Sequence, residues 1–516
     1  MRAICSVEAV RRAEAGAGVP EPVLMQRAST ALAGICLDLL RGQRPRVLGA
    51  RVVALVGSGN NGGDVLWALA LLARRGVATT AVGDPGRMHR DGAAAARAAG
   101  TRVIPWESPE VAAAITSADL VLDGILGIGG AGEVREPAAR TVRAVLGSGV
   151  PVVAVDVPSG VDTDTGAVPG LAMAADVTVC FGTLKPALVV PPARSLAGAV
   201  TVVDIGLRPD DLEPTAWALS LADLVVRGPA PEAHKYSRGT VGVTAGSPGY
   251  PGAAVLAVGG ARMAGAGLVA FGPAPRGEQP APEWPDGIRA TPALLAGLDP
   301  VAAMVLARYP DVVLDGGGRA VDARCVGPGL GRDRDATESV LRALADPAPL
   351  VLDASALAVL TRQDGRRALA DRAGAGWVSV LTPHAGEFAR AGFDPSGGPL
   401  VAARRAAQES GAVLVLKGPG TVVAAPGATY VDTFGDASLA TAGSGDVLAG
   451  LIAGMLATAV RAGDLDTAGA ALVAARAVGL HGLAGRLAAG DGAPVTAVEV
   501  VAHLRAAHAA AAAALT

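Results

Sequence analysis

The sequence predicts a two-domain α/β protein, in which each domain contains a mainly parallel sheet covered by helices. The length of 516 residues exceeds one ordinary domain. From residue 51 onward, short Val-rich runs alternate with Ala-rich helical segments, a pattern typical of strands joined by crossover helices. The alternation breaks in the Pro- and charge-rich stretch 207–239 and then resumes, so we place the boundary near 213–220, between domains 1–213 and 220–516.

The first domain begins with helix-like apolar spacing over residues 1–40. Apolar runs then predict its strands at 51–56, 77–82, 119–122, 151–155 and 176–181. Such runs are typical of strands that are buried on both faces, so helices are expected on both sides of this sheet.

The second domain has apolar runs that predict strands at 240–244, 311–314, 349–352, 377–381 and 412–416. Residues 421–431 are expected to form a hairpin, 273–287 an exposed loop, and 506–516 a helix or frayed end. The apolar stretch 447–460 is shorter than the roughly 18 residues that span a bilayer, so a buried helix is expected there.

Composition narrows the class of protein. The net charge of −3, without basic clusters, argues against binding to nucleic acid or to an anionic membrane. Cys5, Cys36, Cys180 and Cys325 form no CxxC pair, which predicts free buried thiols in a reducing compartment. Charges near the N-terminus argue against a signal peptide. We expect a soluble cytoplasmic homo-oligomer with small-molecule partners.

The stretch VGSGNNGGDV (56–65) contains a GxGxxG pattern between a predicted strand and a predicted helix. With Asp84 about 20 residues downstream, it resembles a dinucleotide-binding loop. A hydride-transfer enzyme has no general need for the two asparagines and the aspartate in this turn. The pattern alone therefore leaves open whether the loop holds a nicotinamide cofactor or another ligand.

Polar side chains follow several predicted strands of the first domain, at the edge where α/β sheets bind ligands. Asn61, Asp123 and Ser159 could offer oxygen ligands to a monovalent cation or to water, whereas Asp156 and Lys185 could form a proton-transfer pair. Each such residue alone would more often be a turn or capping residue, but their repetition at strand ends favours a site.

Five motifs in this half resemble the NAD(P)H-hydrate epimerase domain: LMQRAS (24–29), GSGNNGGD (57–64), LDGILGIG (122–129), VDVPSGVD (155–162) and FGTLKP (181–186). The resemblance implies a Rossmann-like three-layer sandwich and a bound potassium ion, held by Asn61, Asp123 and Ser159. It also implies that the nicotinamide is a damaged substrate rather than a hydride carrier. The residues that it assigns to the hydrated dinucleotide are Asn60, Asn61, Gly62, Gly63, Asp64, Gly127, Ile128, Gly129, Gly130, Ala131, Gly132, Glu133 and Asp156. Val65, Ile128 and Ala187 depart from the family pattern.

In the second half, the stretch ATAGSGDVLAGLIAGML (440–456) places glycines and Asp446 before an apolar helix. Free amides at a helix start bind anions, and Asp446 could accept a proton from a hydroxyl that attacks a phosphate. The alternative is a plain N-cap aspartate. LKGPGT (416–421) could cradle phosphates or form an ordinary hairpin turn, and His384 in LTPHAGEF follows another strand.

GSGD with an upstream KGxxT resembles the ribokinase-like superfamily. More narrowly, HKYSRGTVGVTAGSPGYPGAA (234–254), VGPGLG (326–331), LDASAL (352–357), LTPHAGEF and KGPGT are similar to the NAD(P)H-hydrate dehydratase family. By this resemblance, Ala253, Gly329, His384 and Asp446 would contact the hydrated nicotinamide nucleotide. The co-substrate, ADP or ATP with Mg²⁺, would be held by Lys417, Gly418, Pro419, Gly420, Thr421 and Gly445. Ser355 replaces an acidic residue of the family, and GDASLA (435–440) replaces its usual lead to the GSGD loop.

Together the two resemblances imply an enzyme that repairs hydrated NAD(P)H. One domain would interconvert the R and S hydrates, and the other would phosphorylate the ring hydroxyl of the S form and eliminate phosphate. Three alternatives remain at this point: a vitamin or sugar kinase fused to a weakened Rossmann-like domain, a first half that binds nucleotide without catalysis, and a redox dehydrogenase.

Overall fold

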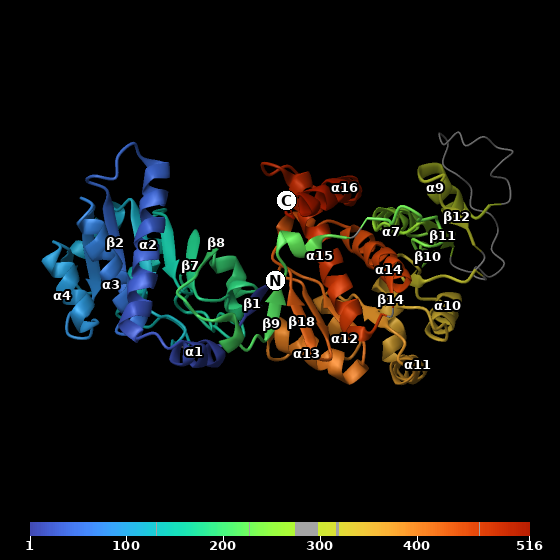
Figure 1. Ribbon diagram of the computed structural model, residues 1–516, viewed down its shortest axis with the longest axis horizontal. Coiled ribbons are helices and arrows are strands. Elements are labelled where there is room, and N and C mark those ends of the chain that lie inside the picture. The colour runs from blue at the N-terminus through green and yellow to red at the C-terminus, as the bar shows by residue number, and fades with distance from the viewer. Residues whose placement is uncertain (131, 227, 274–297, 316–318, 464, 516) are drawn as a thin grey trace. The chain divides into compact units, whose positions relative to one another are not determined.

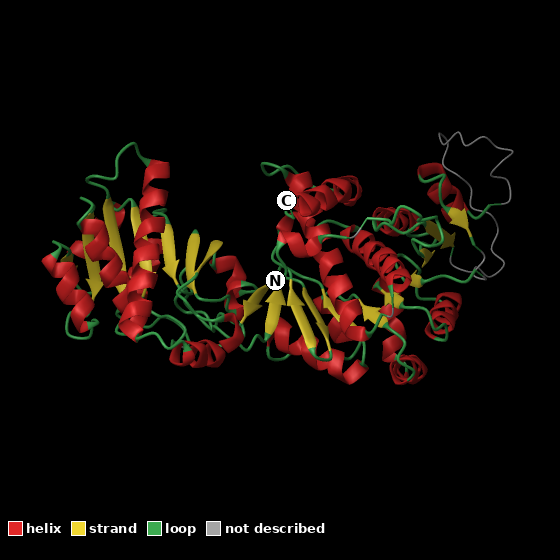
Figure 2. Cartoon of the chain, viewed as in Figure 1, coloured by secondary structure: helices red, strands yellow, loops and turns green. Residues whose placement is uncertain are grey.

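The computed structural model describes residues 1–515 except 131, 227, 274–297, 316–318 and 464. The chain divides into two compact units by its internal contacts. We call residues 2–217 the N-terminal unit and residues 218–516, with Met1, the C-terminal unit. Each unit contains a sheet with helices on both faces (Figure 1, Figure 2), which confirms the predicted α/β class.

The N-terminal unit is built on a parallel sheet of order β4-β3-β2-β5-β6-β7-β8. Its strands are β2 (Arg51–Val56), β3 (Ala78–Gly83), β4 (Arg102–Ile104), β5 (Leu120–Gly124), β6 (Val152–Val155), β7 (Val177–Phe181) and β8 (Ala199–Val203). Two short strands, β1 (Arg2–Ile4) and β9 (Ala216–Ala218), lie at the two ends of this part of the chain. The predicted strands are confirmed, but β4 and β8 were missed because one is very short and the other mixes polar and apolar residues.

Helices cover both faces of this sheet. They are α1 (Val7–Gly16), α2 (Glu21–Gln43), α3 (Asn60–Ala73), α4 (Arg90–Ala98), α5 (Glu110–Thr116) and α6 (Ala138–Leu146). Along β2, Val52, Ala54 and Val56 pack in one core cluster with α2, α3 and α4, whereas Val53 and Leu55 pack in another with α5 and α6. Alternate side chains of the strand therefore pack into two apolar cores, one on each face of the sheet. This explains why the sequence of β2 is Val-rich without polar interruptions.

In the sheet of the C-terminal unit, the strands lie in the order β18-β17-β16-β15-β14-β13-β10-β11-β12. Its strands are β10 (Thr240–Thr244), β11 (Leu268–Gly272), β12 (Val313–Leu314), β13 (Ala323–Val326), β14 (Leu350–Leu352), β15 (Ser379–Leu381), β16 (Val413–Leu416), β17 (Val422–Ala425) and β18 (Ala428–Val431). The last two form the predicted antiparallel hairpin. The loop predicted at 273–287 lies outside the described residues, apart from Pro273.

The helices of this unit form two layers. They are α7 (Pro251–Met263), α9 (Pro300–Arg308), α10 (Arg334–Leu344), α11 (Gln363–Gly374), α12 (Ala385–Arg390), α13 (Gly398–Ser410), α14 (Ser444–Ala462), α15 (Thr467–Ala489) and α16 (Ala497–Ala513). One layer, containing α7, α14, α15 and α16, shares a core with the sheet, and Figure 1 shows α10, α11 and α13 on the other side.

The length of α14 corrects one prediction. At 19 residues it is longer than the expected 447–460, and by length and composition α2, α14 and α15 could each cross a membrane. The apolar windows of α14 and α15 are nevertheless 61% and 67% buried within the described protein. The prediction of a buried helix is thus confirmed, whereas the argument from its length was wrong. Cys5, Cys36, Cys180 and Cys325 are free and buried, as expected.

Candidate active sites

Three predicted cation ligands converge where β5, β6 and α3 meet. Asp123, at the end of β5, is fully buried and its carboxylate accepts hydrogen bonds from the Ser159 amide at 2.8 Å and the Ser159 hydroxyl at 2.6 Å. The Leu126 amide donates to Ser159 Oγ at 2.9 Å, and Asn61 Nδ2 donates to the Leu126 carbonyl at 3.2 Å. The backbone of Leu126 therefore ties all three side chains together.

Burial raises the pKa of Asp123 to about 6, although the hydrogen bonds from Ser159 oppose this shift. No charged side chain within the described parts of the chain pairs with this carboxylate. A fully buried carboxylate without a cationic partner costs free energy, so the site favours a bound cation.

Asp156 and Lys185 form a buried ion pair at the ends of β6 and β7. Lys185 Nζ donates to Asp156 Oδ1 at 2.5 Å and to the Phe181 carbonyl at 2.8 Å. Burial alone would lower the pKa of Lys185, but the charge of Asp156 raises it above its usual value. Lys185 therefore stays protonated beside the Asp156 carboxylate.

The backbone at Asp156 has a φ of 68°, in the left-handed region that non-glycine residues seldom adopt. Asp156 Oδ1 also accepts the Phe181 amide at 3.1 Å. Such a conformation costs free energy and is retained where the surrounding structure requires it, and it clusters at active sites. Here it turns the carboxylate toward Lys185 immediately after β6.

The ion pair opens into a cavity of about 770 Å³ within the N-terminal unit. This volume is typical of small-molecule sites. Among the predicted residues it is lined by Asn60, Asn61, Asp64, Gly127, Ile128, Gly129, Gly130, Asp156 and Lys185. Of the other predicted residues in this region, Gly62, Gly63, Gly132 and Glu133 do not line it, and Ala131 lies outside the described residues.

Two glycines at the start of α3, Gly57 before the helix and Gly62 in its first turn, are required by close backbone approach. A Cβ atom placed on Gly57 would lie 1.9 Å from the Ile125 carbonyl oxygen, and one on Gly62 would lie 2.2 Å from the Gly57 carbonyl oxygen. The glycines of the GxGxxG pattern therefore allow this turn to pack against the loop that follows β5. Asp84, which completes the dinucleotide-binding pattern in the sequence, accepts the Gly86 amide at 2.9 Å in a turn.

Two acidic residues that line this cavity, Asp64 and Glu14, have raised pKa values. Asp64 Oδ1 is buried without a hydrogen-bond partner among the described residues, and burial followed by the charge of Asp156 raises its pKa well above the usual range. Glu14 of α1 also lines the cavity, and its pKa is raised by burial and by Asp156. Glu14 was not predicted as a site residue, because the sequence pattern of α1 does not distinguish it from an ordinary surface glutamate.

The departures from the family pattern fit the local packing. Val65 is fully buried, and a Cβ placed on Gly124 would lie 2.3 Å from Val65 Cγ2, so the missing side chain at 124 makes room for this valine. Ile128 packs beside the small core formed by Cys5, Ala9 and Val10. The Asp156–Lys185 ion pair and the cavity are both present beside these substitutions.

In the C-terminal unit, Asp446 lies inside the first turn of α14 and does not cap it. The N-cap is Gly443, with a φ of 88° and no side-chain cap, so the plain N-cap interpretation of Asp446 is wrong. Burial raises the pKa of Asp446 to about 7; the negative charges of Asp353 and Glu387 add to this, and Lys417 opposes it. A carboxyl with this pKa suits general-base catalysis near neutral pH.

Lys417 lies beside the start of α14, where a Cβ placed on Gly445 would be 3.2 Å from its Nζ. Its Nζ donates to Asp353 Oδ1 at 2.7 Å, and Thr382 Oγ1 donates to the same oxygen at 2.7 Å. Asp353 is 1% exposed and was missed as a site residue, although it follows β14 at the carboxyl end of the sheet. The same strand-end rule that identified Asp123 could have found it.

The loop 417–421 joins the antiparallel strands β16 and β17, so it is a hairpin turn as well as a candidate phosphate loop. Gly420 has a φ of 79°, and the Gly418 amide donates to Thr421 Oγ1 at 3.3 Å. Pro419 completes this turn. Lys417 also forms an isolated parallel bridge with His384, which joins the two predicted ligand-binding segments.

His384 has a structural task that the sequence analysis did not foresee. It is the N-cap of α12, where its Nδ1 accepts the amides of Gly386 at 3.0 Å and Glu387 at 3.3 Å. Glu387 in turn accepts the His384 amide at 3.0 Å, which completes a capping box. This explains part of the TPHxGE string by local structure. The other ring nitrogen, Nε2, lies 3.4 Å from Glu387 Oε1, so both nitrogens of His384 face groups of its own helix start.

Gly329 and Ala253, two residues predicted to contact the substrate, lie side by side. A Cβ placed on Gly329 would lie 2.6 Å from Ala253 Cβ, and Gly329 has a φ of 60° that favours glycine. Ser355 Oγ donates to the Gly327 carbonyl at 3.3 Å, so the residue that replaces a family acid is held by the backbone. The described residues contain no cluster of three metal-binding side chains.

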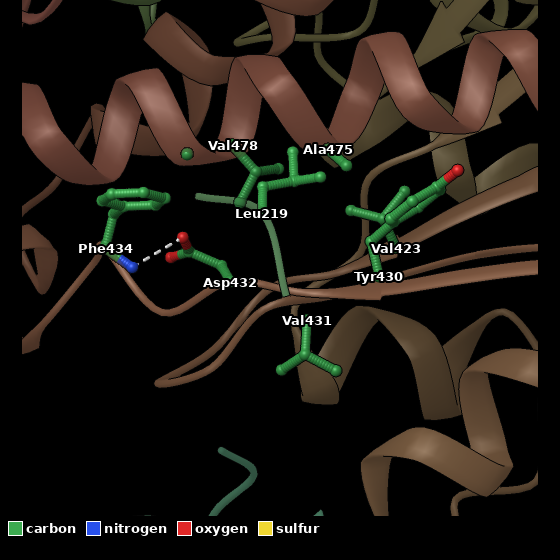
Figure 3. A pocket seen from close by; sticks show the side chains of 9 residues that line it. Leu219, Val423, Tyr430, Val431, Asp432, Phe434, Ala475 and Val478 are labelled. Atoms are coloured by element: carbon green, nitrogen blue, oxygen red, sulfur yellow. Dashed lines mark hydrogen bonds between the residues drawn. The ribbon is translucent and has the colours of Figure 1, made fainter. Parts of the chain in front are cut away.

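The loop that leads to Asp446 rests on α15. His481 Nε2 lies 2.9 Å from the Ser444 carbonyl, and burial lowers the pKa of His481 to about 4. Figure 3 shows Asp432, at the end of β18, accepting the Phe434 amide close to Ala475 and Val478 of α15. The cavity there has a volume of about 10 Å³, room for about one water molecule, so it is no nucleotide site.

Two family models match the chain. Residues 21–187 match the YjeF-related protein N-terminus, and residues 241–504 match NAD(P)H-hydrate dehydratase. A Mycobacterium leprae protein named bifunctional NAD(P)H-hydrate repair enzyme Nnr is 42% identical over 525 residues, covering 99% of this chain and 100% of the relative. The chain belongs to the family of bifunctional NAD(P)H-hydrate repair enzymes.

Other members of this repair-enzyme family are similar over most of the chain. The protein of the same name from Mycobacterium tuberculosis is 41% identical over 476 residues, covering 90% of this chain and 91% of its own. A solved structure of an ADP/ATP-dependent NAD(P)H-hydrate dehydratase from Bacillus subtilis is 25% identical with a TM-score of 0.43, covering 57% of this chain and 97% of that one. The family models and the two mycobacterial relatives confirm the resemblance of both halves to this repair-enzyme family.

Proposed function

We propose that the N-terminal unit interconverts the R and S hydrates of NAD(P)H and that the C-terminal unit dehydrates the S form with ADP or ATP. The observation that carries the proposal is the presence of two separate acid–base sites, Asp156–Lys185 and Asp446, each in the unit whose sequence matches the corresponding family.

For epimerisation, the reacting carbon carries a hydroxyl beside the ring nitrogen. Loss of that hydroxyl as water leaves an iminium ion, and addition of water from the other face inverts the centre. Asp156 is the base that takes the proton from the incoming water, and the ion pair with Lys185 holds its carboxylate in position. Asp64, with its unpartnered buried oxygen in the same cavity, is the candidate donor of a proton to the leaving hydroxyl.

Potassium is part of this proposal, because the residues at the strand ends fit it. Asp123, Ser159 and Asn61 bring a carboxylate, a hydroxyl and an amide to one place, and oxygen atoms are the ligands that hard cations prefer. When bound there, the ion supplies positive charge beside the substrate cavity. The buried Asp123 carboxylate would then have the cationic partner that it lacks among the described side chains.

For dehydration, the ring hydroxyl attacks the terminal phosphate of the nucleotide while Asp446 takes its proton. Phosphate is a far better leaving group than hydroxide, so the ring-nitrogen lone pair then expels it and restores the dihydropyridine. The amides at the start of α14 and Lys417 hold the phosphates. Mg²⁺ would be bound mainly by these phosphates, with Glu387 and Asp353, whose charges act on Asp446, as candidate carboxylates on the protein.

One experiment tests this function directly. The purified chain is mixed with separated R or S hydrate and with ADP or ATP, and the absorbance at 340 nm is followed. The S hydrate should recover full absorbance only with nucleotide, and the R hydrate should recover more slowly, through the S form. A stable phosphorylated vitamin or sugar without recovery would support the kinase alternative. Hydride transfer to an ordinary substrate would support the dehydrogenase.

We expect Asn61→Ala or Asp123→Ala to slow the conversion of R to S hydrate and to leave dehydration of the S hydrate largely intact. The reason is that these side chains belong to the N-terminal unit and contact nothing at Asp446. Both rates are measured on one protein sample, in potassium and in sodium buffers. Equal loss of both activities in a folded variant would show that the two sites are not independent.

A further inference from the structure

A second cavity in the N-terminal unit has no part in the proposed chemistry. Its volume is about 580 Å³, again typical of a small-molecule site, and its walls come from α2, α3 and the start of α4. Asp156 and Lys185 do not line it. Its largest aromatic wall is Trp67 of α3, which is half-buried.

The second cavity adjoins the catalytic cavity. Glu21, Met25 and Asn60 line both, and Asn60 Nδ2 donates to Glu21 Oε1 at 2.6 Å where they meet. One ligand longer than either cavity can therefore occupy the two together. Moving the Glu21 side chain would widen the passage without disturbing the fold, because this hydrogen bond is exposed.

The helix α3 arranges its side chains along this path. Asn60, Trp67, Leu71 and Arg74 lie within an arc of about 60° on its surface, given 100° of rotation per residue. Asn61 and Asp64 follow toward the catalytic side of the same helix, where they line the catalytic cavity. One helix thus presents a base-stacking surface to one cavity and catalytic groups to the other.

The start of α3 lies at the junction and is suited to an anion. Its N-cap is Gly59, without a side-chain cap, so the amides of the first turn remain available to a ligand. A diphosphate at this point would leave one nucleotide on each side. Since the catalytic pair lines only the first cavity, the reacting nicotinamide must lie there.

Gly63 of the NNGGD motif supports the second cavity rather than the first. A Cβ placed on it would lie 3.0 Å from Met25 Cε and 3.2 Å from His89 Cγ, and both of those residues line the second cavity. His89 Nδ1 accepts the Gly92 amide at 3.2 Å, so its ring is held in place as a wall. The absence of a side chain at 63 therefore lets these two walls close.

We propose that the second cavity binds the adenosine half of the hydrated dinucleotide, with the adenine stacked on Trp67. This inference rests on the proposed epimerase function, since it assumes a dinucleotide whose nicotinamide lies beside Asp156. Adenine offers a planar face to the indole, and stacking of a base on an aromatic side chain is a substantial source of affinity.

The first test is a direct binding experiment with AMP on the full-length chain. Adenine stacked on an indole quenches its fluorescence, so AMP should quench wild type saturably, and Trp67→Leu should lose that component. Trp106→Leu is the matched control, because Trp106 is also half-buried in this unit but packs against the core on the other sheet face. Equal quenching in wild type and Trp67→Leu would overturn the proposal.

The second test separates the two halves of the substrate. For the R hydrate of NADH, Trp67→Leu should raise the epimerase KM by roughly 5- to 100-fold and leave kcat unchanged. For the hydrate of reduced nicotinamide mononucleotide, which lacks adenosine, its KM should match wild type. Trp67→Phe, which keeps an aromatic face and guards against misfolding, should retain most of the affinity. A KM raised equally for both substrates would overturn the proposal.

These outcomes also distinguish the inference from the function on which it rests. If wild type epimerises neither hydrate but AMP quenches Trp67, the epimerase proposal fails and the adenosine site stands. If wild type epimerises both hydrates and Trp67→Leu changes neither KM nor the quenching, the function stands and the adenosine site fails.

Discussion

Replacing Asp446 by Asn is expected to lower the rate of dehydration by at least about 100-fold, because Asn keeps the size of the side chain but cannot take the hydroxyl proton. Burial and the neighbouring carboxylates raise the pKa of Asp446 to about 7. A base acts only when it is ionised, so the wild-type rate should rise with pH through about 7. The variant should lose this rise. The measurement is kcat for the S hydrate with saturating nucleotide, as a function of pH.

Stability provides an independent check on this variant. The folded-state pKa of Asp446 lies above its unfolded value, so ionisation costs the folded protein stability as pH rises through the unfolded pKa toward about 7. At pH 8, the denaturant midpoint of the C-terminal unit should therefore be equal or higher in Asp446→Asn than in wild type, while the dehydration rate falls. This combination is expected of a catalytic group and not of a structural one.

Asp466→Asn is the matched control. Asp466 is a true N-cap, of α15, and its carboxylate accepts the Gly469 amide at 2.7 Å. Asn caps helices about as well as Asp, so this substitution should change neither rate nor stability appreciably. Retention of more than half the wild-type dehydration rate by Asp446→Asn would remove this residue from the mechanism.

Replacing Lys185 by Met is expected to abolish epimerisation and to lower the free energy of unfolding of the N-terminal unit by about 3–5 kcal/mol. Lys185 is 1% exposed, and its loss would leave the Asp156 carboxylate buried without its cation. Hydrogen exchange of the amides in β6 and β7 would report this locally, while dehydration by the C-terminal unit should continue.

A double substitution separates the stability of the pair from its chemistry. Asp156→Asn combined with Lys185→Met removes both charges, so it should recover most of the lost stability without restoring epimerisation. Arg41→Met is the control for loss of an ion pair as such, because Arg41 and Asp38 pair on an exposed helix face and should contribute less than about 1 kcal/mol. A Lys185→Met protein as stable as wild type would contradict the buried-pair argument.

Much of the site could be predicted because it follows the strands. Asp123 lies at the end of β5, Asp156 directly follows β6, and Lys185 lies in the loop after β7. Parallel strands bring their carboxyl ends to one edge of the sheet. Asp353 obeys the same rule, because it directly follows β14. Asp446 was identified from the glycines before it, and its raised pKa agrees with the proposed role.

Other residues could not have been found in this way. Glu14 reaches the catalytic cavity because α1 packs beside loops more than 100 residues away in sequence. His481 meets the Ser444 carbonyl through the packing of α15 on α14, and no local pattern predicts that pairing. The role of His384 as a helix cap depends on the exact residue at which α12 begins. Sequence patterns predict a helix start only to within a few residues.

The sequence by itself therefore determined the two α/β units, most of their strands, and the polar residues at strand ends, because hydrophobic periodicity and turn chemistry are local properties. Only the tertiary structure decided which charges are buried together, which glycines are required by close approach, and how the space around α3 is divided into two cavities. These depend on contacts between residues distant in sequence, and such contacts set the burial that shifts a pKa and the shape that admits a ligand.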